Sequence, residues 1–130
     1  MRILVADPYW GDRGLIQDIL ELGGHEIFLA GDAEGTLAAK QEHSPEVVLL
    51  DLTIARPDNY QFAARLKGDP RWRTVILIAL VPYVHWNECE RLESYGFDGY
   101  IPKPVSVLTL GNLVAQIVSS KAATVKRQRA

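Results

Sequence analysis

Three charged residues, Asp7, Asp51 and Lys103, have the chemistry to handle a phosphoryl group together. Two carboxylates can hold magnesium, a hard cation that prefers oxygen ligands. A lysine ammonium can neutralise a phosphoryl oxygen. Each of the three residues follows or ends a short apolar run, so each is expected at the end of a strand. Such a site suits phosphoryl transfer, in which positioning and charge neutralisation provide most of the catalysis.

The stretch at residues 46–51, Glu-Val-Val-Leu-Leu-Asp, gives the clearest structural signal in the chain. Its four consecutive apolar residues predict a strand that is buried on both faces, as in a parallel sheet. Asp51 would then lie at the carboxyl end of that strand, the edge where open α/β sheets bind ligands. Taken alone, the stretch fits equally well an Asp51 that only caps the following loop.

Strands are predicted at residues 3–6, 25–30, 46–51, 74–81 and 98–102, with helices at 33–43, 60–67 and 84–95, after the first strand and from 106 onward. Asp32 is the expected N-cap of the 33–43 helix. Five strand–helix repeats predict an α/β doubly wound sheet, with five parallel strands in the order 2-1-3-4-5. The first, third and fifth strands would then bring their carboxyl ends together. A structure with Asp7 and Asp51 on opposite edges would refute this prediction.

Composition indicates one globular domain in a reducing compartment. The 130 residues are 48% hydrophobic and 23% charged, which suffices for one sizeable core. A net charge of −2 argues against a nucleic-acid partner. The single cysteine excludes an internal disulfide. No apolar run approaches the roughly 18 residues that a membrane span needs. We therefore expect a cytoplasmic protein with no membrane partner.

Residues 2–119 resemble a bacterial response-regulator receiver domain, in particular a single-domain one. Three motifs in register carry the resemblance: Ile3-Leu-Val-Ala-Asp7, Pro45-Glu-Val-Val-Leu-Leu-Asp51-Leu and Gly96-Phe-Asp-Gly-Tyr-Ile-Pro-Lys103-Pro104. The spacings from Asp51 to Lys103 and from Tyr100 to Lys103 also match the pattern of that family. The resemblance implies a flavodoxin-like fold and a signalling domain that is not an enzyme.

The same resemblance implies a role for each site residue. Asp51 would accept a phosphoryl group from a histidine kinase or a phosphotransfer protein, and Lys103 would bind that group. Asp7, Asp51 and the backbone carbonyl of Thr53 would hold the Mg²⁺ that the family requires. The signal would pass to a downstream protein partner through protein–protein contacts. The sequence leaves open whether the chain forms a homodimer.

Three positions depart from the family pattern. Pro8 replaces a second acid, which removes one charge and one metal-ligating oxygen. Val81 stands where a serine or threonine usually binds the phosphoryl group, and a valine cannot make that hydrogen bond. The switch aromatic, Tyr100, therefore lacks its usual partner. We expect Mg²⁺ to bind weakly or not at all. Asp12 and Asp58 are nearby acids that could substitute for the missing acid, although the family pattern places neither.

These departures leave two main functions open. One is a receiver that is phosphorylated on Asp51. The alternative is a phosphorylation-independent pseudo-receiver, an interaction module with the same fold. A small flavodoxin-like enzyme or cofactor binder is disfavoured, because residues 7–11 offer one glycine and no glycine-rich phosphate loop.

Aromatic residues near the site have two interpretations. Tyr9, Trp10 and Trp86 suit a partner surface, and Tyr9 and Trp10 equally suit packing behind the site. Trp72 lies in a polar segment between two arginines and is expected to be half exposed. Residues 120–130 are basic and are expected to form a disordered tail after a receiver domain at 1–119.

Overall fold

Five parallel strands form one sheet in the computed structural model, which describes residues 1–55 and 58–129 and, among these, side chains as far as Lys121. The strand order is β2-β1-β3-β4-β5, as predicted. The strands are β1 (Arg2–Ala6), β2 (Glu26–Ala30), β3 (Val47–Asp51), β4 (Ile76–Val81) and β5 (Gly99–Pro102). Because β1 pairs with both β2 and β3, the carboxyl ends of β1 and β3 are adjacent.

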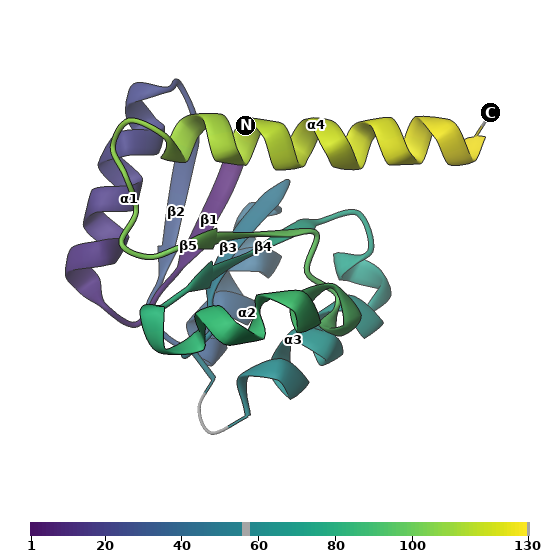
Figure 1. Cartoon of the computed structure of the whole chain (residues 1–130), viewed down its shortest axis with the longest axis horizontal. Coiled ribbons are helices and arrows are strands. Elements are labelled where there is room, and N and C mark those ends of the chain that lie inside the picture. The colour runs from purple at the N-terminus through teal and green to yellow at the C-terminus, as the bar shows by residue number, and fades with distance from the viewer. Residues whose placement is uncertain (56–57, 130) are drawn as a thin grey trace.

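Helices cover both faces of the sheet (Figure 1). The α-helices are α1 (Trp10–Leu22), α2 (Ala33–His43), α3 (Asn59–Gly68) and α4 (Leu110–Arg129), and the 3-10 helices are η1 (Pro70–Trp72) and η2 (Tyr83–Tyr95). α1 and α4 pack on one face, whereas α2, α3 and η2 pack on the other. This arrangement confirms the predicted flavodoxin-like, doubly wound fold.

The central strands are buried on both faces, and this burial explains their uninterrupted apolar runs. In β1, Ile3 and Val5 belong to the core under α1 and α4, whereas Leu4 and Ala6 belong to the core on the opposite face. Every residue of β3 is buried. A strand between two cores cannot alternate apolar with polar side chains. The site at the end of β3 is therefore held by a strand that is packed on both sides.

The predicted start of α2 is confirmed. The side chain of Asp32 accepts a hydrogen bond from Gly35 N at 2.6 Å, so Asp32 is the N-cap of α2, as predicted. The carboxylate satisfies one of the free N–H groups of the first turn. A Cβ atom at Gly35 would lie only 2.8 Å from the same carboxylate oxygen, so the cap depends on a glycine at this position.

The prediction that Trp72 is half exposed is wrong. Trp72 ends η1 and is only 3% exposed, within the core on the α3 face. The side chain of Asp69 accepts a hydrogen bond from Arg71 N and starts the short turn that directs the indole inward. The ammonium of Lys40 lies 5.8 Å from the centre of the ring. The polar neighbours of Trp72 face solvent, and they hid a core residue in the sequence.

The last helix is longer than the sequence suggests. The backbone of α4 is helical to Arg129, through residues that the sequence predicts as a disordered tail. Because side chains beyond Lys121 lie outside the described part, the division into a domain at 1–119 and a tail at 120–130 stays a prediction. Across the described residues, none of the helices combines the length and the apolar character needed to cross a bilayer.

Candidate functional site

The carboxyl edge of the sheet brings Asp7, Asp51 and Lys103 together. Asp7 follows β1, Asp51 ends β3 and Lys103 follows β5. The β1–β3 register pairs Ala6 with Leu50, which sets the two aspartates side by side. Both aspartates are fully buried, and Lys103 is 8% exposed. The fold thus gathers three charges from distant parts of the chain into one buried cluster.

The ammonium of Lys103 lies at the centre of this cluster. Its Nζ donates a hydrogen bond to Oδ2 of Asp7 at 2.6 Å and to Oδ2 of Asp12 at 3.0 Å. The same Nζ lies 2.6 Å from Oδ2 of Asp51. The ring centre of Tyr9 is 5.1 Å from Nζ, which is a cation–π contact. One cation therefore serves three carboxylates.

The two oxygens of Asp51 have different surroundings. Oδ1 accepts hydrogen bonds from Thr53 N at 2.7 Å and from Thr53 Oγ1 at 2.5 Å. Oδ2 is buried and, among the described residues, accepts no hydrogen bond of normal geometry, although it is ion-paired with Lys103. Thr53 therefore fixes the orientation of the carboxylate and leaves Oδ2 as the oxygen available for chemistry.

Asp7 is held through its side chain and its backbone. Its Oδ1 accepts a hydrogen bond from Tyr9 N at 2.9 Å, and its carbonyl oxygen accepts one from Nη1 of Arg13 at 3.0 Å. A Cβ atom at Gly31 would lie 2.5 Å from the same Nη1. Gly31 therefore leaves the space through which Arg13 reaches the site.

Burial and ion pairing act against each other on the charged groups. Burial raises the pKa of Asp7, and the hydrogen bonds from Lys103 and Tyr9 offset only part of that rise. Burial alone would lower the pKa of Lys103, but the contacts with Asp51 and Asp7 outweigh it and raise that pKa. Both pKa values are raised. The single ammonium of Lys103 is shared among carboxylates, so its contact with Asp7 lowers the pKa of that carboxyl by less than burial raises it. Lys103 is therefore protonated at neutral pH.

Of the two nearby acids considered as substitutes, Asp12 is at the site and Asp58 is not. Asp12 lies in the first turn of α1, from where it reaches Lys103. Asp58 is exposed and accepts a hydrogen bond from Gln61 N at 2.9 Å as the N-cap of α3. The sequence did not reveal this difference because the place of Asp12 depends on where α1 begins, and α1 begins without a side-chain cap.

The oxygen ligands that could hold magnesium are few. The resemblance implies the carboxylates of Asp7 and Asp51 and the carbonyl of Thr53, and Pro8 offers no side-chain oxygen. Within residues 1–55 and 58–129, no three His, Cys, Asp or Glu residues are arranged to hold a metal ion. The buried Oδ2 of Asp51 is already paired with the ammonium of Lys103 at 2.6 Å, so a metal ion would have to share this oxygen with the ammonium or displace it. The binding of Mg²⁺ therefore stays an expectation from the resemblance.

The two expected switch positions differ in burial. Val81 ends β4 and is fully buried, whereas Tyr100 is 48% exposed on β5. The carbonyl of Val81 accepts hydrogen bonds from Lys103 N at 2.9 Å and from Nε1 of Trp86 at 3.1 Å. The end of β4 is thus joined to η2 through a backbone carbonyl and an indole.

Exposed aromatic residues border the mouth of the site. Trp10 is 80% exposed and Tyr83 is 73% exposed, so neither is a core residue. A cavity of about 310 Å³ is lined by Tyr9, Asp12, Pro82, Tyr83, Lys103 and Pro104, and Trp10 directly follows Tyr9 in the chain. We refer to Tyr9, Trp10 and Tyr83 as the aromatic rim.

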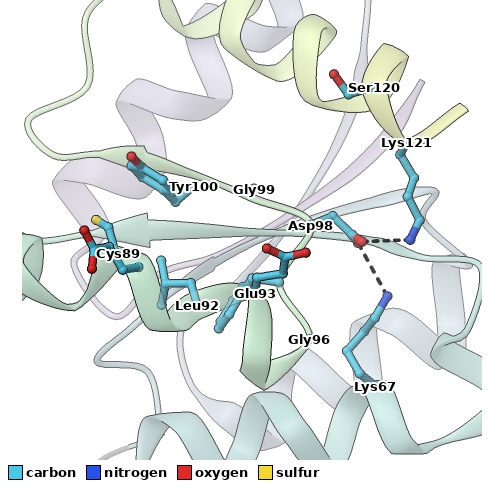
Figure 2. A pocket seen from close by; sticks show the side chains of 12 residues that line it. Lys67, Cys89, Leu92, Glu93, Gly96, Asp98, Gly99, Tyr100, Ser120 and Lys121 are labelled. Carbon is cyan, nitrogen blue, oxygen red and sulfur yellow. Dashed lines mark hydrogen bonds and ion pairs between the residues drawn. The ribbon is translucent and has the colours of Figure 1, made fainter. Parts of the chain in front are cut away.

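A second hollow, of about 720 Å³, is bordered by η2, β5 and α4 (Figure 2). Asp98 is ion-paired with Lys67 of α3 at 3.4 Å and with Lys121 of α4 at 2.9 Å. Its Oδ2 also accepts a hydrogen bond from Leu77 N at 2.8 Å. These contacts anchor the start of β5, and Tyr100 lies on the wall of the same hollow.

Known proteins with similar sequences include response regulators, although no protein-family model matches the chain. An uncharacterized 14.6 kDa protein in the sodA1 3′ region of Leptolyngbya boryana is 29% identical over 116 residues, covering 89% of this chain and 88% of that protein. The polar-differentiation response regulator DivK of Brucella anthropi is 28% identical over 105 residues, covering 81% and 85%.

Solved structures give the same class of fold. The chemotaxis response regulator CheY4 of Vibrio cholerae superposes with a TM-score of 0.80 at 18% identity, covering 89% of this chain and 97% of that one. The receiver domain of NtrX from Brucella abortus superposes with a TM-score of 0.79 at 24% identity, covering 90% and 98%. The chain therefore has a receiver-domain fold. With the named relatives, this confirms its resemblance to bacterial response-regulator receivers.

Proposed function

We propose that this chain is a receiver of a two-component phosphorelay, which accepts a phosphoryl group on Asp51 and signals through protein–protein contacts. The observation that carries the proposal is the buried cluster in which Nζ of Lys103 lies 2.6 Å from carboxylate oxygens of both Asp7 and Asp51. The similarity to response regulators supports the same class. The chain would act as a cytoplasmic signalling domain and not as an enzyme.

In the proposed transfer, Oδ2 of Asp51 is the nucleophile because Thr53 occupies Oδ1. Oδ2 attacks the phosphorus of a phosphohistidine. The new P–O bond forms as the P–N bond breaks, and the leaving imidazole takes up a proton. Lys103 neutralises a phosphoryl oxygen on the acceptor. Mg²⁺, held by Asp7, Asp51 and the carbonyl of Thr53, would supply further charge neutralisation.

Access to the nucleophile requires local movement. Oδ2 of Asp51 is buried beneath Lys103, whose ammonium lies close to the ring of Tyr9. A donor can approach only if the lysine side chain and the ring move aside. Both lie next to the 310 Å³ cavity, so the mouth of the site has space for that movement.

The proposal is tested with phosphoramidate and Mg²⁺, followed by intact mass spectrometry. We expect the wild-type chain to gain the mass of one phosphoryl group and the Asp51→Asn variant to gain none. Asp18→Asn is the matched control, because it makes the same change at an exposed position of α1. A phosphorylated Asp51→Asn variant would place the acceptor elsewhere, and an unmodified wild type would refute the proposed transfer.

A pseudo-receiver is the second candidate, and the Val81 position favours it. A buried valine offers the phosphoryl group no hydroxyl, and its carbonyl already accepts two hydrogen bonds. In this case the chain would bind its partner equally well as wild type and as Asp51→Asn. Loss of partner binding in Asp51→Asn would exclude the pseudo-receiver.

We propose two partner surfaces. A histidine kinase or phosphotransfer protein would dock at the aromatic rim, beside the nucleophile. A downstream protein would dock on the face formed by η2, β5 and α4, where Trp86 and Tyr100 are partly exposed. Large amphipathic side chains of this kind anchor protein contacts. Formation of a homodimer stays an open question.

Alanine variants test whether these tryptophans are surface residues. We expect Trp10→Ala to change the free energy of unfolding by less than about 0.5 kcal/mol, because its side chain is mostly exposed. Trp86→Ala should cost about 1 kcal/mol, because it loses the hydrogen bond to Val81. Both should weaken partner binding. Denaturant unfolding measures the stabilities, and strong destabilisation of both variants would assign the tryptophans to the core.

A further inference from the structure

The 310 Å³ cavity lies directly beside the groups that would carry out the transfer. Lys103, whose Nζ is 2.6 Å from Oδ2 of Asp51, forms part of its wall. Asp12, whose Oδ2 is 3.0 Å from the same Nζ, forms another part. Because both carboxylate oxygens touch one ammonium, they lie within two contact lengths of each other. Asp51 is buried, so a group displaced by its attack must depart outward, past this cavity.

The other walls of the cavity are aromatic or apolar. They are contributed by Tyr9, Tyr83, Pro82 and Pro104. The ring of Tyr83 packs edge-on against Trp86, with 4.9 Å between the ring centres, and Nε1 of Trp86 is hydrogen-bonded to the backbone at the end of β4. These contacts hold Tyr83 in place before a ligand arrives. The volume is at the lower end of small-ligand sites, about 300–1,000 Å³, and suits a single ring.

Asp12 gives this cavity a negative group. Its side chain is 49% exposed, whereas those of Asp7 and Asp51 are fully buried. Of these three carboxylates, Asp12 is the one that lines the cavity, so a ligand bound there can reach it. All three share the ammonium of Lys103. When Lys103 turns to a phosphoryl group, Asp12 loses its cation and becomes available to pair with a cationic ligand.

We propose that this cavity binds the imidazolium ring of the phosphohistidine donor. Asp12 accepts a hydrogen bond from the ring N–H, and Tyr9 and Tyr83 form the walls around the ring. The inference rests on the proposed function, because the donor is that of the proposed transfer. A carboxylate strengthens a hydrogen bond from a charged N–H, and the faces of aromatic rings attract cations. Asp12 and the two tyrosines would thus select the leaving group.

The proposed contact also accounts for the proton that the leaving imidazole takes up. A phosphohistidine protonated on its second ring nitrogen carries a positive charge, and Asp12 would stabilise that form. As Oδ2 of Asp51 forms its bond to phosphorus, the P–N bond breaks and its electron pair returns to nitrogen. The ring then leaves as neutral imidazole, with its proton still directed at Asp12. A donor that releases an anion instead would gain nothing from this carboxylate.

Rates of phosphorylation from two donors test the proposal, with Mg²⁺ present and intact mass as the readout. Monophosphoimidazole carries the ring, whereas acetyl phosphate has no ring and releases acetate. Asp12→Asn should slow transfer from monophosphoimidazole about ten-fold and lower its rate relative to acetyl phosphate, because it removes a charged acceptor. Tyr83→Leu should lower the same ratio about three-fold, since leucine has no π face. Asp18→Asn, at an exposed position of α1, should keep both rates within about two-fold.

The outcomes separate this inference from the proposed function. The assignment of the cavity is overturned if Asp12→Asn uses monophosphoimidazole as fast as the wild type, if the ratio falls only because acetyl phosphate reacts faster, or if Asp18→Asn has the same effect. A wild type that accepts a phosphoryl group would in those cases leave the proposed function intact. A wild type that accepts none from either donor would refute the proposed function and this inference with it. Asp12 is half exposed, so its variant should stay folded, and circular dichroism checks this.

Discussion

Replacing Lys103 with methionine is expected to destabilise the folded chain by about 3–5 kcal/mol at neutral pH. The substitution keeps much of the side-chain volume and removes the charge. Asp7 and Asp51, both fully buried, would then face each other without an ammonium. An uncompensated buried carboxylate costs far more than the net value of the ion pair that it had formed. Urea unfolding of the wild type and the variant measures the difference.

The loss in the free energy of unfolding that Lys103→Met causes should depend on pH. Burial already raises the pKa of Asp7, and loss of the ammonium raises it further. When the pKa of a carboxyl group is higher in the folded than in the unfolded chain, the free energy of unfolding falls as pH rises from the unfolded to the folded pKa. The variant should therefore be closer to the wild type at pH 5 than at pH 8.

Lys121→Met is the matched control for Lys103→Met. The side chain of Lys121 is 38% exposed, and its ammonium pairs with Asp98. Losing this ion pair should lower the free energy of unfolding by no more than about 1 kcal/mol. If Lys103→Met proves as mild as this control, then the buried carboxylates are solvated or protonated in the folded chain. The ion-pair account of the site would then be wrong.

The second prediction concerns the conformational response to phosphorylation at the two switch positions, Val81 and Tyr100. We expect beryllofluoride, a mimic of the phosphoryl group, to shift NMR signals only around Asp51 and Lys103. Val81 has no hydroxyl, so the modified state lacks the hydrogen bond that a serine or threonine at this position would donate to the charged phosphoryl group. Such a bond is worth about 1.5–3 kcal/mol, or roughly ten-fold to a hundred-fold in population. A modification shifts an equilibrium only by its differential interaction with the two states.

The anchoring of η2 favours the same result. Nε1 of Trp86 hydrogen-bonds to the carbonyl of Val81, and Glu88 accepts a hydrogen bond from the hydroxyl of Tyr60 on α3. Tyr60 also stacks on Tyr95 with 4.5 Å between the ring centres. A movement of η2 would break these contacts. Shifts that spread to Tyr100 and along η2 would show a working switch and would refute the pseudo-receiver.

The Val81→Thr variant provides the matched comparison. Threonine is similar in size to valine and restores the hydroxyl, although a hydroxyl in this buried position carries some cost in stability. With beryllofluoride, we expect this variant to show shifts that extend further from Asp51 than in the wild type. Equal shifts in both proteins would mean that the hydroxyl does not limit the response.

Elements with a simple physical signature could be predicted from the sequence. The apolar run before Asp51 identified a strand that is buried on both faces, and Asp32 identified the start of α2. The alternation of strands and helices, together with the two-sided burial expected for the third and fourth strands, led to the predicted sheet order. Because parallel strands share an edge, the meeting of Asp7, Asp51 and Lys103 followed from the same alternation.

What could not be predicted depends on the direction in which a side chain points. Trp72 is buried by a three-residue turn that has no periodicity to reveal it. Asp12 reaches Lys103 only because α1 begins at Trp10, and the sequence there offers no cap to mark that start. The 3-10 character of η2 likewise has no signature in the spacing of apolar residues. Each case depends on tertiary contacts that residue types alone do not specify.

The site joins the two ends of the domain, since Lys103 lies 96 residues after Asp7. During synthesis, β1, β2 and β3 leave the ribosome first, and these three strands are neighbours in the sheet. Their aspartates then lack an ammonium, and an ionised carboxylate without a partner stays in water. The carboxyl edge of the nascent sheet must therefore remain hydrated until β5 docks. A chain released before residue 103 would lack this ammonium and would keep both carboxylates in solvent.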